Sequence, residues 1–115
     1  MKTKDELNHL SGVIIDSAME VQRELLLRGI PSRRQVPTEV FYKGEHLDEE
    51  AYRIDLLVNE CVVVEIKTVS AMVPIHEAQL HTYMRLANKC LGLLINFNVI
   101  LLRDGIKRHV INFPQ

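Results

Sequence analysis

The sequence predicts a single domain of mixed α and β structure, with the core order αβββαβ, a mixed central sheet flanked by helices, and a β-hairpin at its C-terminal end. The chain has 115 residues, the length of one domain, so residues 1–115 are expected to share one core. Apolar residues make up 47% and charged residues 25%, a composition typical of a folded protein. Segments with helical periodicity alternate with β-rich runs, which indicates the order of elements.

A long amphipathic helix is predicted at the start of the chain. Thr3 and Glu6 have the spacing of a capping box, and the apolar residues that follow recur every three or four positions, as one face of a helix requires. These residues are Leu7, Leu10, Ile14, Ala18, Val21 and Leu25. Gly29 favours a left-handed cap and Pro31 cannot continue a helix, so the helix is expected to end near Arg28.

Three β-strands are predicted next. Residues 34–43 combine β-branched and aromatic residues, and Pro37 within them indicates an edge or bulged strand because proline has no N–H to donate. Residues 51–58 and 61–69 are predicted as the next two strands. A hairpin is expected where the chain turns between them, around residues 59–60.

A second helix and a buried strand follow. Pro74 is well placed as a first helical residue, and the apolar spacing after it predicts a helix ending near Asn88 and Lys89. Residues 91–96 form a continuous apolar run that is typical of a buried central strand.

The last predicted element is the C-terminal hairpin. Residues 99–103 and 106–111 are two β-rich segments that flank Asp104-Gly105. This dipeptide is a strong signal for a type I′ turn, so the two segments are predicted to pair with each other.

Charged residues interrupt two of the predicted strands. Glu65 and Lys67 are two positions apart in a valine-rich strand, so they lie on one face of it. Asp55 interrupts the preceding strand in the same way. Burying an ionised group is costly unless it is paired, hydrogen-bonded or bound to a metal, so these three residues require a reason.

The length of the loop between the two strands decides whether the carboxylates meet. In an antiparallel hairpin the residue numbers of opposite partners have a constant sum, and Asp55 shares a face with Glu65 only when that sum is even. A two-residue loop at residues 59–60 gives an odd sum, and a three-residue loop gives an even one. We predict the three-residue loop, which brings Asp55, Glu65 and Lys67 together with Cβ atoms roughly 4.5–8 Å apart.

Two carboxylates and a lysine on one face suit the metal-assisted hydrolysis of a phosphodiester. Carboxylate oxygens bind Mg²⁺ or Mn²⁺, the ion polarises the phosphoryl oxygen and acidifies a bound water, and the ammonium orients that water or screens developing charge. The alternative is a salt bridge of Lys67 with Glu65 or Asp55 on a solvated face of the sheet. The apolar setting of Glu65 and the presence of Asp55 favour the metal site.

The spacing from Asp55 to the Glu-x-Lys motif at Glu65 resembles that of the PD-(D/E)XK nuclease superfamily. Five ordered blocks over nearly the whole chain are similar to the GxxExxY family of that superfamily, which consists of small prokaryotic proteins. They are YRIDLLV (52–58), VEIK (64–67), PIHEAQL (74–80), GLLINF (92–97) and DGIKR (104–108). The resemblance implies a restriction-endonuclease-like fold and a divalent-metal-dependent nuclease that hydrolyses phosphodiester bonds in nucleic acid. The alternative is a catalytically inactive relative that binds nucleic acid or a protein.

The resemblance also implies roles for individual residues. Asp55 and Glu65 would ligate Mg²⁺ or Mn²⁺, with the carbonyl oxygen of Ile66 as a third ligand. Lys67 would position the attacking water. Gln79 matches the position, on the helix after the Glu-x-Lys strand, where related nucleases place a polar residue that faces the site.

One part of the family pattern is missing from this chain. No G-x-x-E-x-x-Y sequence occurs, and MEVQREL (19–25), which resembles the end of the family's first helix, runs directly into LLRGI (26–30), which resembles the end of the second. The helix between them would supply an acidic residue near the metal. Glu24, and less well Glu20, is the candidate substitute from its helical position, and the alternative is a solvated residue. The loss is expected to leave a weaker metal site, an inactive remnant, or a homodimer in which a second copy covers the sheet surface left exposed.

Pairs of basic residues are the other signal for nucleic acid. The net charge of −1 gives no long-range attraction for a phosphate polymer. Arg33-Arg34 and Lys107-Arg108 are therefore expected either to contact phosphates locally or to be simply solvated.

The histidines and cysteines predict no further site. His76 and His81 are five positions apart and diverge by about 140° around a helix, which does not suit a zinc site. Cys61 and Cys90 form no CxxC pair and are expected to be buried. No secretory leader and no apolar run of roughly 20 residues is apparent, so a cytoplasmic protein that does not enter a membrane is expected.

Overall fold

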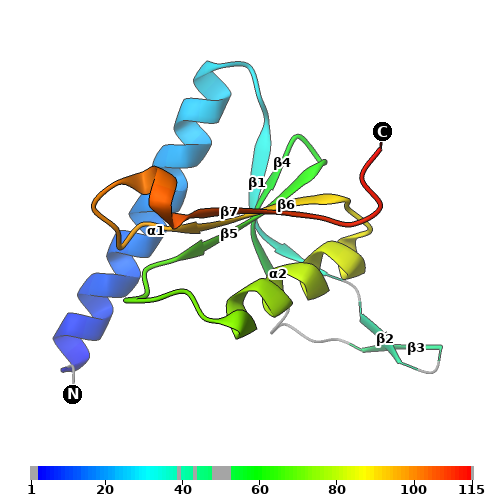
Figure 1. Cartoon of the computed structure of the whole chain (residues 1–115), viewed down its shortest axis with the longest axis horizontal. Coiled ribbons are helices and arrows are strands. Elements are labelled where there is room, and N and C mark those ends of the chain that lie inside the picture. The colour runs from blue at the N-terminus through cyan, green and yellow to red at the C-terminus, as the bar shows by residue number, and fades with distance from the viewer. Residues whose placement is uncertain (1–2, 39, 43, 48–52, 115) are drawn as a thin grey trace.

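The computed structural model describes residues 3–38, 40–42, 44–47 and 53–114, and in it two helices cover a central sheet (Figure 1). The sheet contains five strands in the order β1-β4-β5-β6-β7. They are β1 (Ser32–Pro37), β4 (Arg53–Val58), β5 (Val62–Lys67), β6 (Leu91–Asn96) and β7 (Ile106–Val110). The pairs β1-β4, β4-β5 and β6-β7 are antiparallel and β5-β6 is parallel. The predicted class, an αβββαβ core with a mixed sheet flanked by helices, is confirmed.

The first helix, α1 (Lys4–Leu27), has the predicted caps and bounds. The Glu6 N–H donates to Thr3 Oγ1 at 3.1 Å, and the Thr3 N–H donates to the Glu6 carboxylate at 3.3 Å. At the other end Arg28 is the cap and Gly29 has a φ of +78°, which glycine adopts without strain. The helix continues without a break through residues 19–27, where the resemblance places two helix ends.

The two helices pack on opposite faces of the sheet. The second helix, α2 (Pro74–Ala87), connects the parallel strands β5 and β6, as a crossover helix does. The α2-side cluster contains Ile54, Leu57, Val63, Leu80, Tyr83, Met84 and Leu94. The α1-side cluster contains Ala18, Leu56, Val64 and Ile66. Because side chains alternate between the two faces of a strand, membership of a cluster identifies the face that a residue occupies.

The loop between β4 and β5 has the predicted odd length. Val58 pairs with Val62, so residues 59–61 form a three-residue loop and the sum of partner numbers is even. Asn59 and Glu60 in this loop have positive φ angles of 52° and 57°. The register that brings Asp55 opposite Glu65 is therefore the one observed.

The strand predicted at residues 34–43 is divided in the structure. β1 ends at Pro37 and lies at the edge of the sheet, where a residue without an N–H is tolerated. The later part, β2 (Val40–Tyr42), pairs with β3 (Glu45–Leu47) in a separate two-stranded sheet. The short strand β3 was not predicted.

The expected hairpin at Asp104-Gly105 is wrong in its first strand and its turn. Residues 99–103 form no strand, and β7 pairs with β6 itself after a short 3-10 helix, η1 (Leu102–Gly105). Gly105 is not among the glycines of positive φ. A Cβ atom at this position would overlap the backbone oxygen of Asn96. The glycine therefore permits a close approach of two chain segments rather than a type I′ turn.

Candidate active site

Two carboxylates occupy the gap where β4 and β5 separate. The backbone pairing of the two strands ends at Leu56 and Val64, and the next residues in the same register are Asp55 and Glu65. The Asp55 N–H donates to Glu65 Oε1 at 3.3 Å, and the Ile66 N–H donates to Asp55 Oδ2 at 2.8 Å. The side chains thus replace the backbone ladder at this point, and the predicted meeting of the two carboxylates is observed.

The backbone is irregular at the level of Asp55. Ile54 belongs to the α2-side cluster and Leu56 to the α1-side cluster, although residues two apart in a strand normally share a face. On the neighbouring strand Gln35 has a φ of +52° and is skipped by the pairing of β1 with β4. Both strands therefore change face at one level, and distortions of this kind are frequent at functional sites.

Glu65 is held in an environment that disfavours its charge. The residue is only 3% exposed, and it lies between valine and isoleucine in the central strand β5. Burial, and secondly the charge of Asp55, raise the pKa of Glu65 to about 8, while hydrogen bonding to the Asp55 backbone and the charge of Lys67 act in the opposite direction. A carboxyl group whose pKa is raised by burial and by a neighbouring like charge is a candidate functional group.

Lys67 and Gln79 meet beside the carboxylates. Lys67 is the last residue of β5, and its Nζ donates to Gln79 Oε1 of α2 at 3.0 Å. Alternation along β5 places Lys67 on the same face as Glu65. Gln79, which the resemblance places on this helix facing the site, thus contacts Lys67 directly.

Asn96 is a buried residue that sequence reasoning did not assign to the site. It is 2% exposed at the end of β6, in register with Lys67. Its Oδ1 accepts from the N–H groups of Val69 and Asn98 at 3.1 Å each, and its Nδ2 donates to the Val69 carbonyl at 2.9 Å. Asn96 thereby holds the backbone just after Lys67. In the sequence, the feature that could have identified Asn96 is its position as the polar last residue of the otherwise apolar run 91–96.

A cavity adjoins Asp55 on the α1 side of the sheet. Its volume is about 290 Å³. It is lined by Ile15, Ala18, Arg34, Gln35, Asp55 and Ile66. The cavity therefore combines one carboxylate, one guanidinium and an apolar wall.

The expected substitute for the missing acidic residue does not reach the site. Glu24 is bound to Arg28 at 2.9 Å with its side chain 58% exposed, and Glu20 lies 3.5 Å from Arg23 with its side chain 69% exposed. Both are solvated helix residues. Within the described ranges, no group of three or more His, Cys, Asp or Glu side chains is arranged to hold a metal. Among the described residues, the carboxylates that meet at the site are therefore those of Asp55 and Glu65.

The histidines have structural partners, and one cysteine differs from expectation. His76 Nδ1 accepts from the Val73 N–H at 3.1 Å at the start of α2. His81 Nδ1 lies 2.9 Å from Nε2 of His109 on β7, so the two histidines of α2 have separate partners. Cys61 is exposed and Cys90 half-buried. The expected burial is therefore wrong for Cys61, which belongs to the β4–β5 loop, and only partial for Cys90.

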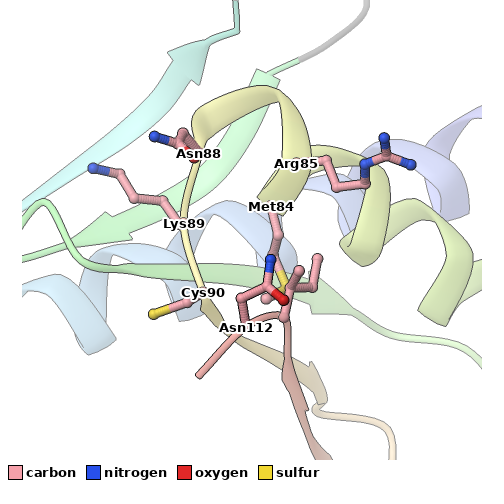
Figure 2. Close-up of a pocket in the computed structure, with 7 residues that line it drawn as sticks. Met84, Arg85, Asn88, Lys89, Cys90 and Asn112 are labelled. Carbon is pink, nitrogen blue, oxygen red and sulfur yellow. The ribbon is translucent and has the colours of Figure 1, made fainter. Parts of the chain in front are cut away.

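A second cavity lies at the opposite end of the sheet. It has a volume of about 350 Å³ and lies around Cys90, just before β6. Figure 2 shows Arg85 and Lys89 at this cavity with their side chains extending in opposite directions. Its lining includes no carboxylate. This arrangement provides neither a metal site nor converging positive charges.

Comparison with known proteins identifies the superfamily. A family model described as the PD-(D/E)XK nuclease superfamily matches residues 9–109. No match to the chain was found among curated proteins or among solved structures. None of the helices described by the structure is long and apolar enough to cross a membrane. The matched region includes the sheet, both carboxylates and the Lys67–Gln79 pair, and the chain belongs to the PD-(D/E)XK nuclease superfamily.

Proposed function

We propose that this domain is a divalent-metal-dependent nuclease that hydrolyses phosphodiester bonds in nucleic acid. The observation that carries the proposal is the pair of carboxylates, Asp55 and Glu65, in the gap between β4 and β5, where each accepts a hydrogen bond from a backbone N–H of the opposite strand. The two carboxylates interrupt the backbone ladder, and Glu65 is buried while Asp55 is half-buried, which is unfavourable unless a bound group compensates. The superfamily to which the chain belongs supports a nuclease-like activity.

The oxygen atoms around this gap fit Mg²⁺ or Mn²⁺. We assign Asp55 and Glu65 as ligands, with the carbonyl oxygen of Ile66 as the third. The N–H and carbonyl of one strand residue point to the same edge, and the Ile66 N–H donates to Asp55, so its carbonyl points toward the same strand, β4. Hard oxygen donors of this kind suit both ions.

The bound ion would polarise the phosphoryl oxygen and lower the pKa of the attacking water. The Lys67 ammonium orients that water and screens the charge that develops on the phosphate oxygens. Gln79 holds Lys67 through its Oε1, at 3.0 Å from Nζ. As water oxygen bonds to phosphorus, the phosphorus–oxygen bond to the leaving sugar oxygen breaks, and a proton passes from the water to the leaving group through solvent.

The alternative function is a catalytically inactive relative that binds nucleic acid or a protein. The observation that favours it is the small number of ligands: among the described residues, no third His, Cys, Asp or Glu joins Asp55 and Glu65 in a group that could hold a metal. A protonated Glu65 would weaken metal binding further, because the cation must first displace a proton.

Two finer assignments belong to the same proposal. We assign the chain to the GxxExxY family, without the segment that names it, because the continuous helix α1 joins the two helix ends of the family pattern. We also assign it to the cytoplasm, where the free thiols of Cys61 and Cys90 would stay reduced.

Cleavage assays on labelled DNA and RNA oligonucleotides test the proposal. We expect cleavage in Mg²⁺ or Mn²⁺ that EDTA abolishes and that Lys67→Ala lowers by at least about a hundredfold. Lys89→Ala is the matched control, because Lys89 lines the cavity at the opposite end of the sheet. Absence of metal-dependent cleavage, or cleavage that survives Lys67→Ala, would overturn the enzymatic function. Binding without cleavage would support the inactive relative.

A further inference from the structure

The two adjacent arginines of β1 have different surroundings. Arg33 makes two hydrogen bonds to the Glu60 carboxylate, at 2.6 and 2.8 Å. Arg34 forms no ion pair with any residue that the structure describes, and it lines the cavity beside Asp55. The sequence alone does not distinguish the two arginines. In the structure, Glu60 neutralises the guanidinium of Arg33, whereas that of Arg34 is available to a ligand.

The register of β1 explains the separation. Arg34 is paired with Leu56, and Arg33 with Leu57. Leu56 packs in the α1-side cluster and Leu57 in the α2-side cluster, and paired residues share a face. Arg34 is therefore on the face where α1 covers the sheet, one position before Gln35, which lies at the level of Asp55.

The cavity has the chemical character of a nucleotide subsite. Asp55 and Arg34 line it together without forming an ion pair with each other. The remaining wall includes the apolar side chains of Ile15, Ala18 and Ile66. A phosphate suits the guanidinium, and an apolar wall suits the flat face of a base or a sugar ring.

The size and position of the cavity limit the form of the nucleic acid. Its volume of about 290 Å³ is at the lower end of small-ligand pockets, which are roughly 300–1,000 Å³. It lies between α1 and the strands β1, β4 and β5, so a base must leave its stack to enter. Unstacking costs least when the strand is already single.

We infer that the cavity lined by Arg34 and Asp55 holds one unstacked nucleotide next to the scissile phosphate, with Arg34 bound to its phosphate, so that single-stranded nucleic acid is the preferred substrate. This inference rests on the proposed function. It identifies Arg34 as a substrate-binding residue and Arg33 as a structural one.

Equilibrium binding of fluorescent oligonucleotides tests the inference. The full-length chain carrying Lys67→Ala, which prevents cleavage, is titrated in Mg²⁺ with single-stranded DNA, single-stranded RNA and a duplex of the same sequence. Adding Arg34→Ala should weaken single-strand binding about tenfold and reduce the slope of log K against log salt by about 0.7, the effect of one lost phosphate contact. Adding Arg33→Ala should change neither quantity appreciably.

A second variant tests the cavity independently of charge. Ile15 is half-exposed at the cavity wall, so Ile15→Trp should fill the cavity and weaken single-strand binding while Arg34 remains. Leu27→Trp, at an exposed position near the end of the same helix, is the matched control and should have no effect. Circular dichroism would verify that each variant is folded.

The outcomes separate this inference from the proposed function. Equal effects of Arg34→Ala and Arg33→Ala, or tighter binding of the duplex than of the single strand, would overturn the inference while metal-dependent cleavage still stands. If no oligonucleotide binds and the unmodified chain cleaves none in Mg²⁺ or Mn²⁺, the proposed function and the inference both fail.

Discussion

At the scale of single residues, the candidate site depends on polar groups placed where the sheet would otherwise be apolar. Glu65 and Asn96 are both nearly inaccessible to solvent. Glu65 accepts from the backbone N–H of Asp55 in β4, and Asn96 is bonded to the backbone of Val69 after β5. Their burial differs in its energetic cost. The amide of Asn96 keeps its hydrogen bonds, whereas a charged Glu65 is repelled by the carboxylate of Asp55. Their substitution should therefore change stability in opposite directions.

We predict that Glu65→Gln stabilises the metal-free protein at pH 8. At low pH, Glu65 is protonated in both folded and unfolded chains. As the pH rises, the unfolded chain ionises first, near 4.5, and stability is lost until the folded chain ionises at about 8. The loss is on the order of 4 kcal/mol.

Urea unfolding in EDTA across this pH range would measure the effect. The matched control is Glu77→Gln, because Glu77 is exposed and its bond to Lys107 lowers its pKa. The Glu77→Gln variant should therefore still lose stability as the pH rises, as the unmodified chain does. A variant Glu65→Gln whose stability follows the same pH curve as the unmodified chain would contradict the prediction.

We predict that Asn96→Ala destabilises the fold by about 2–3 kcal/mol, since it leaves the Val69 N–H and carbonyl and the Asn98 N–H without their partner. Asn98→Ala is the control, because Asn98 is exposed and should cost less than about 0.5 kcal/mol. Chemical unfolding measures both. Asn96 is a positioning residue in the proposed nuclease, so kcat should fall more than KM changes, and equal effects of the two variants would refute this role.

At the scale of elements, the connection between β6 and β7 packs against the ends of β5 and β6. The segment between β6 and β7 returns to the end of β6, so that Gly105 lies directly against the Asn96 backbone. The Phe97 N–H also donates to the Lys67 carbonyl at 2.9 Å. The end of β5 that carries Lys67 is therefore held from the β6 side by a connection without regular structure.

We predict that Gly105→Ala destabilises the protein by about 3 kcal/mol, because the added methyl group overlaps backbone rather than a flexible side chain. Gly12→Ala is the control in a helix, where nothing lies within 4 Å of the added Cβ. It should stabilise the protein by roughly 0.5–1 kcal/mol, since alanine is the better helix former. Thermal unfolding distinguishes the two, and a neutral Gly105→Ala would show that the close approach is not required.

At the scale of the whole molecule, α1 covers the sheet with only part of its apolar surface. Leu26 is 69% exposed and Leu27 76% exposed near the end of the helix, and Met19 on the same helix is about half-exposed. The continuous helix thus presents apolar side chains to solvent beyond those that reach the α1-side cluster.

We propose, and predict as a measurable outcome, that a second copy of the chain covers this surface. Sedimentation velocity should show a dimer whose fraction increases with concentration, and Leu26→Asp should shift the equilibrium to monomer. Ile100→Asp is the control, because Ile100 is fully exposed on the loop after β6, far along the chain from α1. A chain that stays monomeric at every concentration, or a dimer unaffected by Leu26→Asp, would contradict this arrangement.

The sequence by itself determined the order of the core elements, the ends of α1, the three-residue loop at residues 59–61 and the meeting of Asp55 with Glu65. These features depend on local rules: capping, the alternation of side chains and the parity of a hairpin register. Only the tertiary structure decided that Arg34 and not Arg33 lies beside Asp55, that Asn96 holds the chain after Lys67, and that Gly105 marks a close approach. Each of these depends on the packing of segments distant in sequence, and no periodicity within one segment encodes such a contact.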